Sequence, residues 1–279
     1  MKSAIKDIKP KHFNLIDHGE GTIQLELNRP ESMNSFNKET WNEYKDLLYK
    51  LDENDYVRVI ILSGKGKNFS AGIDLKEFGL DALELQKDKV KFFKYIKDFQ
   101  DCISAASCIS KPTIGLYHGT NLGLALDIAV TLTMRVFTKD IKLSIKEVQV
   151  GLVADMGFLQ RAPQLSGNHS LLNKLSLTGN MFGADQAARL GLVDEEDIVN
   201  DKVEGLNRCL KIAKDISKNE AWCVEGTKQC LTEMSELKFD VNEGLDNVAK
   251  INAEKLDIRS IMNKYSRTVS KKSSQKGKL

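Results

Sequence analysis

The stretch KPTIGLYHGTNLGLALD, residues 111–127, predicts a strand, a turn and a helix in that order. Pro112 precedes a short apolar run, a place in a strand where a missing N–H is tolerated. The chain then turns at Gly119 and enters an apolar helix near residues 122–131. This unit decides the fold class because the same order of elements occurs once more upstream.

Residues 57–78 form the upstream unit. The run VRVIIL, residues 57–62, indicates a buried strand, and it ends in the glycine-punctuated turn SGKGKNFSAG. Nearer the start, Ile23, Leu25 and Leu27 alternate with polar residues and predict a half-buried strand, and an amphipathic helix is expected around residues 38–52. Alternating strands and helices indicate an α/β layered fold.

From about residue 200 the pattern is helical only. One face of the first expected helix carries Val203, Leu206, Leu210 and Ala213. Further on, Asp240 with Glu243 resembles a capping box that opens another helix. We therefore expect three parts, which are a core over residues 1–199, a helical region over 200–266 and a basic flexible tail over 267–279.

The bulk composition excludes several classes of function. A net charge of +2 on 279 residues, with acids and bases mixed except in the last thirteen residues, gives no reason to expect a nucleic acid as partner. The five cysteines form no CxxC pair, which argues against a disulfide framework or a zinc site. No apolar run approaches the roughly 20 residues that cross a bilayer, so we expect no membrane partner. The opening residues MKSAIKDIKPK have no apolar segment and no arginine, which argues against a secretory or mitochondrial leader.

Three carboxylates lie in apolar surroundings, namely Asp127 in LGLALDIAV, Glu147 in SIKEVQVGL and Asp155 in GLVADMGFL. A carboxylate among apolar residues must be paired, protonated or functional, because burying a bare charge is costly. The simpler interpretation of each is a helix cap or a satisfied surface group, and the pattern alone favours it. Asp155 fits a cap best, since a helix could open at MGFLQ.

The two turns, GKNFSAGID and HGTNLGLALD, each place backbone N–H groups just before a helix. A helix N-terminus favours negative charge, and two such donors converging on one oxygen would form an oxyanion hole. Glycines that merely make turns explain either segment by itself. No histidine has metal-ligand spacing with another, so we expect structural or surface positions and no metal site for His12, His18, His118 and His169.

Together these segments resemble the crotonase (enoyl-CoA hydratase/isomerase) superfamily. LNRPESMNSF resembles its early LNRP…N segment, NFSAGIDL its first oxyanion-hole turn, and KPTIGLYHGTNLGLALD its second turn and helix. The run AARLGLV resembles its A-x-x-x-G-L-V signature, and the resemblance covers roughly residues 12–200. It implies a crotonase-type spiral of ββα units with a helical C-terminal region, assembled as a trimer or a dimer of trimers.

Within that superfamily, SIKEVQVGLVADMGFLQR is similar to the dienoyl-CoA isomerase pattern VKEVxVGLAADVGxLQR. The resemblance implies that Glu147 and Asp155 are the two proton-transfer acids and that Asp127 tunes the site. Enoyl-CoA hydratases place Gly where Asp155 stands, so Asp155 is the discriminating position. We expect Asp155 to act as the base and Glu147 as the acid.

The resemblance also implies where the thioester binds. The oxyanion N–H groups match Ile73 and Leu124, and the positions that would line the thioester and CoA match Ala71, Gly72, Ile73, Asp74, Leu75 and Leu124. Relatives carry GGG where this chain has Gly123-Leu124-Ala125. Leu124 keeps its N–H but could crowd the acyl pocket, and it cannot take the positive φ open to Gly. We therefore expect Leu124→Gly to retain or raise activity.

The sequence thus predicts an isomerase that converts 3,5-dienoyl-CoA into 2,4-dienoyl-CoA in unsaturated fatty acid β-oxidation, with CoA as part of the substrate and no other cofactor. The alternatives are an enoyl-CoA hydratase or monoene isomerase and, in another class, a non-catalytic acyl-CoA-binding relative. The basic tail also leaves open a nucleic-acid-binding relative. Gly277-Lys278-Leu279 resembles the Ser-Lys-Leu signal read by the peroxisomal import receptor. We expect a peroxisomal location, with the cytoplasm or mitochondria as alternatives.

Overall fold

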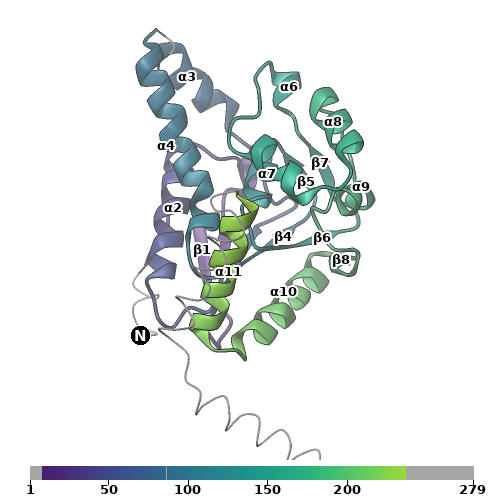
Figure 1. Cartoon of the computed structure of the whole chain (residues 1–279). Helices are drawn as coiled ribbons and strands as arrows, with labels where there is room; N and C mark the ends of the chain where they lie inside the picture. Colours follow the sequence, from purple (N-terminus) through teal and green to yellow (C-terminus); the bar gives the residue numbers. More distant parts are fainter. Residues whose placement is uncertain (1–7, 86, 237–279) are drawn as a thin grey trace, which may run out of the picture.

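A six-stranded sheet lies at the centre of the protein in the computed structural model, which describes residues 8–85 and 87–236 (Figure 1). The strand order is β1-β2-β3-β4-β6-β8. The first pair is antiparallel and the later pairs are parallel. β5 and β7 form a separate two-stranded parallel sheet. The strands are β1 (Phe13–Asp17), β2 (Thr22–Leu27), β3 (Val59–Gly64), β4 (Thr113–Tyr117), β5 (Thr120–Leu122), β6 (Met134–Thr138), β7 (Lys142–Ser144) and β8 (Ile198–Val199).

Helices connect the parallel strands and follow the last one. The α-helices are α2 (Lys38–Asp52), α3 (Leu75–Leu85), α4 (Lys89–Cys108), α5 (Leu124–Ala129), α6 (Glu147–Val150), α7 (Phe158–Leu165), α8 (His169–Thr178), α9 (Ala184–Arg189), α10 (Lys202–Ser217) and α11 (Ala221–Ser235), with short 3-10 turns η1 (Pro30–Ser32) and η2 (Glu195–Asp197). None of them, within the described ranges, is both long and apolar enough to span a bilayer.

Both predicted strand–turn–helix units are present. In the first, β3 leads through a loop into α3, and in the second β4 leads through β5 into α5. The predicted helix at residues 38–52 is also confirmed. The side chain of Asn37 accepts the N–H of Thr40 and caps α2, whose apolar side chains are buried. These elements bring the two turns to the same side of the sheet.

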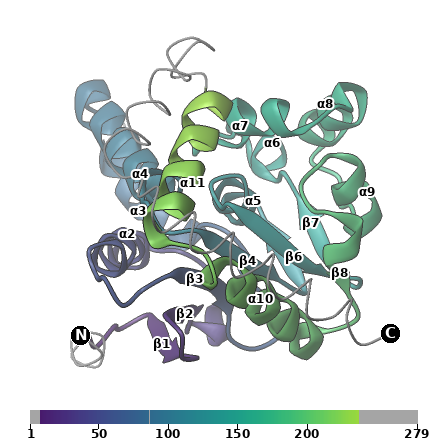
Figure 2. The same cartoon turned by 60° about the horizontal axis from the view of Figure 1, so that its bottom comes forward.

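Helices cover both faces of the sheet, with α10 on one side and α5 on the other (Figure 2). For this reason β2 is not half-buried as predicted. Gln24 on its polar side is only 3% exposed and donates to Ser63 Oγ on β3 at 2.8 Å. Period-two alternation shows which residues share a face, but a polar face can still be covered when its side chains find hydrogen-bond partners.

α10 packs through most of the predicted stripe. Leu206, Leu210 and Ala213 face the sheet together with Cys209, whereas Val203 is 72% exposed, contrary to the prediction. In the first turn Lys202 points inward instead, and its Nζ donates to the carbonyl oxygen of Gly64 at 2.7 Å. Val203 lies about 100° around the helix from Lys202 and so faces solvent. The expected capping box at residues 240–243, the tail at 267–279 and most of the expected helical region beyond α11 lie outside the described residues.

Candidate active site

The two glycine turns meet at Gly72. This residue has a φ of 94°, and a Cβ placed on it would lie 2.4 Å from the carbonyl oxygen of Leu122 and 3.6 Å from the amide nitrogen of Leu124. Only glycine tolerates both the conformation and the contact. The close approach brings Ile73, the next residue, beside Leu124, so the two predicted oxyanion donors lie on adjoining turns.

The N–H groups of Ile73 and Leu124 are available to a ligand. Phe36 bridges the residues on either side of Ile73, because its N–H donates to Gly72 and its carbonyl accepts from Asp74, both at 2.8 Å. Leu124 opens α5, where the first N–H groups have no partner within the helix. In the part of the chain that the structure describes, no protein group accepts either N–H. Two free donors on adjoining turns can together bind an anionic oxygen.

Gly123, rather than Leu124, takes the unusual backbone conformation of the second turn, with φ 50° and ψ −111°. Leu124 is helical, 4% exposed and part of the hydrophobic core. Its side chain therefore packs into the protein, and the positive φ considered for this position belongs to Gly123. A Cβ on Gly123 would lie 2.9 Å from Glu147 Oε1, so the Glu147 carboxylate sits directly over this turn.

Asp127 and Glu147 form a buried carboxyl pair. Asp127, on α5, is 1% exposed, and its Oδ1 accepts the N–H of Phe158 at 2.8 Å. Burial and then the charge of Glu147 raise the pKa of Asp127 well above its usual value. Burial also raises the pKa of Glu147, while a hydrogen bond from Asp127 opposes that rise. The pKa of Asp127, the more deeply buried of the two acids, is therefore the one raised further.

Asp155 lies between α6 and α7, beside a cavity of about 410 Å³ that is also lined by Gln100, Met156 and Arg161. Its backbone carbonyl accepts from Gln100 Nε2 on α4 at 2.7 Å. Burial raises the pKa of its carboxyl group. Asp155 does not cap α7, because Gly157 occupies the N-cap position and Asp127 accepts the Phe158 N–H. The simpler interpretation of Asp155 as a helix cap is therefore wrong.

Comparisons with known proteins identify the family. The family model described as "Enoyl-CoA hydratase/isomerase" matches residues 22–278. The chain is 33% identical to the mitochondrial delta(3,5)-delta(2,4)-dienoyl-CoA isomerase of Rattus norvegicus, over 91% of this chain and 78% of that protein. It is 34% identical to the peroxisomal enzyme of the same name from Arabidopsis thaliana, over 84% of each. The chain belongs to the enoyl-CoA hydratase/isomerase family.

The fold is the one shared by this crotonase family. A putative enoyl-CoA hydratase from Streptomyces coelicolor superposes with a TM-score of 0.82 at 21% identity, covering 94% of this chain and 95% of that one. An enoyl-CoA hydratase from Bacillus anthracis superposes with a TM-score of 0.80, also at 21% identity, covering 92% and 97%. The expected α/β class and crotonase fold are thus confirmed.

The other positions predicted to line the thioester and CoA differ in which of their groups a ligand could reach. The Ala71 N–H donates to the Met33 carbonyl at 2.9 Å, whereas Leu75 is 55% exposed. The Asp74 side chain faces the protein, where it contacts Ser35 and Arg29. Its carboxylate is therefore engaged by the chain itself, and so are its N–H, which donates to Phe36, and its carbonyl, which accepts from Phe78.

Two residues of the LNRPESMNSF segment connect it to the first glycine turn. Asn34 is fully buried with a φ of 56°, and its Nδ2 donates to the carbonyls of Lys65 and Asn68. It ties this segment to the first glycine turn. Arg29 reaches Asp74 from the same segment. Sequence reasoning missed both roles, and the one available signal was that Arg29 lies close behind a buried strand, since Asn34 follows only after the turn η1.

Proposed function

We propose that this chain isomerises 3,5-dienoyl-CoA to 2,4-dienoyl-CoA. The observation that carries the proposal is a third carboxyl group, that of the partly buried Asp155, near the Asp127–Glu147 pair and next to a cavity. The reaction removes a proton from carbon 2 and returns one at carbon 6, so it needs two acids at separate points along the acyl chain. The names of the relatives from Rattus norvegicus and Arabidopsis thaliana support the same reaction.

In the proposed mechanism the thioester oxygen binds between the N–H groups of Ile73 and Leu124. Loss of a proton from carbon 2 places negative charge on that oxygen as a conjugated trienolate forms. Donors already in place stabilise this charge, and removing one such donor typically costs ~10²–10³ in rate. The two N–H groups need no rearrangement to act, because the Phe36 bridge and the start of α5 hold them.

Glu147 is the better candidate for the base at carbon 2. Its carboxylate lies over Gly123, adjacent to the Leu124 N–H, and carbon 2 is bonded to the carbon whose oxygen that N–H would bind. Sequence reasoning alone favoured Asp155 as the base, and the position of Glu147 leads us to reverse the two roles. Asp155, with its raised pKa, would hold a proton to donate at carbon 6.

The electron pairs then shift along the acyl chain from carbon 2 toward carbon 6. The carbon 2–hydrogen pair becomes the 2,3 double bond, the 3,4 pair moves to 4,5, and the 5,6 pair takes the Asp155 proton at carbon 6. Glu147 ends protonated and Asp155 ionised, so one proton must pass between them through solvent before the next turnover. No metal or redox cofactor has a step in this scheme, and CoA enters as part of the substrate.

An ultraviolet assay distinguishes this function from its alternatives. The purified protein should convert a 3,5-dienoyl-CoA into the conjugated 2,4-product, whose absorbance differs from that of the substrate. A protein that instead hydrates 2-enoyl-CoA, or moves the double bond of a 3-enoyl-CoA only, would be a hydratase or monoene isomerase. Tight binding of the dienoyl thioester without turnover would support the non-catalytic alternative.

Assembly and location are further parts of the proposal. The region from residue 200 onward, which includes α10 and α11, would contribute to a trimer or a dimer of trimers, and light scattering on the purified protein measures its mass. Related isomerases are named as mitochondrial in Rattus norvegicus and peroxisomal in Arabidopsis thaliana. The resemblance of Gly277-Lys278-Leu279 to a peroxisomal signal favours the peroxisome. A fluorescent tag on the N-terminus should give peroxisomal puncta that become diffuse when these three residues are deleted.

A further inference from the structure

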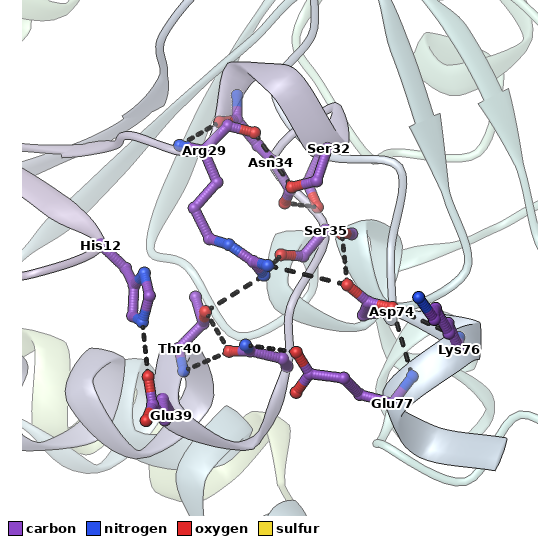
Figure 3. Close-up of polar contacts among 12 residues, drawn as sticks. His12, Arg29, Ser32, Asn34, Ser35, Glu39, Thr40, Asp74, Lys76 and Glu77 are labelled. Atoms are coloured by element: carbon purple, nitrogen blue, oxygen red, sulfur yellow. Dashed lines mark hydrogen bonds and ion pairs between the residues drawn. The ribbon is translucent and has the colours of Figure 1, made fainter. Parts of the chain in front are cut away.

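A half-buried ion pair joins the segment after β2 to the loop that holds Ile73. The Arg29 side chain is 13% exposed, and its Nη2 lies 3.7 Å from Asp74 Oδ2. Its Nη1 donates to the carbonyl oxygen of Ser35 and lies 3.4 Å from Thr40 Oγ1. Figure 3 shows the guanidinium group directed at these three partners. One side chain thus holds two segments that are about 40 residues apart.

Asp74 uses both of its carboxylate oxygens within the protein. Oδ1 accepts the N–H groups of Lys76 and Glu77, at 3.2 and 3.4 Å, and so caps α3. Oδ2 accepts from Ser35 Oγ at 3.4 Å and faces Arg29. These contacts (Figure 3) fix where α3 begins, which is two residues after Ile73.

A second polar contact joins the N-terminus of α2 to α3. Asn37 Nδ2 donates to Glu77 Oε1 at 3.0 Å, while the Asn37 Oδ1 caps α2. The N-termini of α2 and α3 are therefore held together through side chains as well as through the backbone. Within this framework Arg29 supplies the positive charge that faces Asp74.

Phe36 transmits this arrangement to the oxyanion donor. Its N–H and carbonyl hold the residues before and after Ile73, at 2.8 Å each. Arg29 contacts both sides of this bridge. It donates to Ser35, which precedes Phe36, and it pairs with Asp74, which follows Ile73. Any shift of the guanidinium would therefore change the spacing of the bridge and the direction of the Ile73 N–H.

We propose that Arg29 is a positioning residue for the oxyanion hole, acting through Ser35, Phe36 and Asp74 without touching the substrate. A donor acts at 2.7–3.1 Å from the developing oxyanion, and a misplacement of about 1 Å can cost ~10²-fold in rate. Partly buried ion pairs add little net stability. We therefore expect the main effect of Arg29 on the geometry of the oxyanion hole. The kinetic part of this inference rests on the proposed isomerase function.

The test compares Arg29→Met and Arg29→Lys with a matched control. Arg208→Met serves as control, because Arg208 also forms a partly buried pair with an aspartate, Asp197, but on η2 and α10. Two quantities are measured for each variant. One is the separate change in kcat and KM for a 3,5-dienoyl-CoA. The other is the red shift in absorption of bound 2,4-dienoyl-CoA, which reports how strongly hydrogen bonds polarise its carbonyl.

Arg29→Met should lower kcat ~10-fold or more with KM changed less than ~threefold, because the misplaced donor acts mainly on the transition state. The red shift should shrink in parallel, Arg29→Lys should recover part of both, and Arg208→Met should match the wild type. If Arg29→Met does not fold, Asp74→Asn keeps the cap of α3, removes the ion pair and should show the same signature.

Two results would overturn the proposal. A lowered Tm with unchanged kcat and red shift would make the pair purely structural, and a raised KM alone would make Arg29 a CoA contact. The absorption shift separates this inference from the proposed function. If the wild type binds 2,4-dienoyl-CoA but does not isomerise the 3,5-substrate, the proposed function fails, and the shift in Arg29→Met still decides the role of Arg29.

Discussion

The Asp127 carboxylate accepts the backbone N–H of Phe158 at 2.8 Å, although 31 residues separate the two. Phe158 is the first residue of α7, and Asp155 lies three residues before it. The same Asp127 carboxyl group lies close enough to Glu147 for the charge of Glu147 to raise its pKa. One buried side chain is thus connected to the neighbourhoods of both proposed proton-transfer acids.

Asp127→Asn should be mild and Asp127→Leu severe. The amide can still accept the N–H of Phe158 and is uncharged beside Glu147, so we expect kcat within ~tenfold of wild type, a smaller loss than the usual general acid–base contribution. Leucine leaves the buried Phe158 N–H unsatisfied, at a cost of about 1–3 kcal/mol. Thermal unfolding and isomerase assays measure the two effects. An asparagine variant as inactive as the leucine one would mean that Asp127 must be ionised.

The pH profile tests Glu147 as the base. Because burial raises the pKa of Glu147, kcat/KM should fall with decreasing pH at a higher pH than an ordinary glutamate with a pKa of 4.5 would cause. Glu147→Gln should cost at least ~10² in kcat and remove this acid limb. Glu196→Gln, at a side chain that is 87% exposed, is the control. Retention of near-normal turnover by Glu147→Gln would exclude Glu147 as the base.

Leu124→Gly should unfold more easily than the wild type, an effect separate from the activity that the sequence predicts to be retained or raised. Leu124 is 4% exposed in the core, and removing a buried leucine side chain costs about 2–5 kcal/mol, with a further ~1 kcal/mol for glycine in a helix. The N–H belongs to the backbone, so kcat of the folded fraction should stay within a few-fold. Leu124→Ala should show most of the stability loss in denaturant unfolding. An unchanged Tm in both variants would contradict the burial of this side chain.

Lys228 gives a prediction about stability and pH. Its Nζ donates to the carbonyls of Ala106, Ile109 and Lys111, at 2.9, 2.6 and 3.0 Å, and burial lowers its pKa from 10.5 to about 8. Between these two pH values the unfolded chain binds more protons at this site than the folded one. The free energy of unfolding should therefore gain a contribution from Lys228 as pH rises from 8 to 10.5.

Lys228→Met should lower stability by about 2 kcal/mol or more, since it leaves buried carbonyls without donors, and should lose that pH-dependent contribution. Lys94→Met, at a lysine that is 73% exposed, is the control. Urea unfolding at pH 7.5 and 10 measures both. Identical pH dependence in wild type and Lys228→Met would show that the site does not titrate as described.

Local pattern and resemblance predicted the elements and candidate acids well, but not the contacts among them. The spacing in residues 111–127 was enough for a strand, a turn and a helix, and apolar neighbours marked Asp127 as buried. Neither signal says what covers a surface, which is why Gln24 and Val203 were assigned to the wrong environments.

The role of Arg29 was out of reach for the same physical reason. Its partners, Ser35 and Asp74, are brought together by contacts between loops, among them the one-residue bridge between Phe36 and Ile73. A single bridge between two loops leaves no periodic pattern in either segment. Leu124 likewise fits the backbone where relatives carry glycine, because the demanding conformation belongs to Gly123.

Isomerisation in D₂O tests the central claim, that two separated acids act on one acyl chain, most directly. The wild type should form 2,4-dienoyl-CoA from the 3,5-substrate with deuterium entering at carbon 6. Asp155→Asn should still exchange the carbon 2 protons with solvent but form product at least ~10²-fold more slowly, because the acid at carbon 6 is missing. Near-normal product formation by Asp155→Asn, with deuterium at carbon 6, would contradict the account.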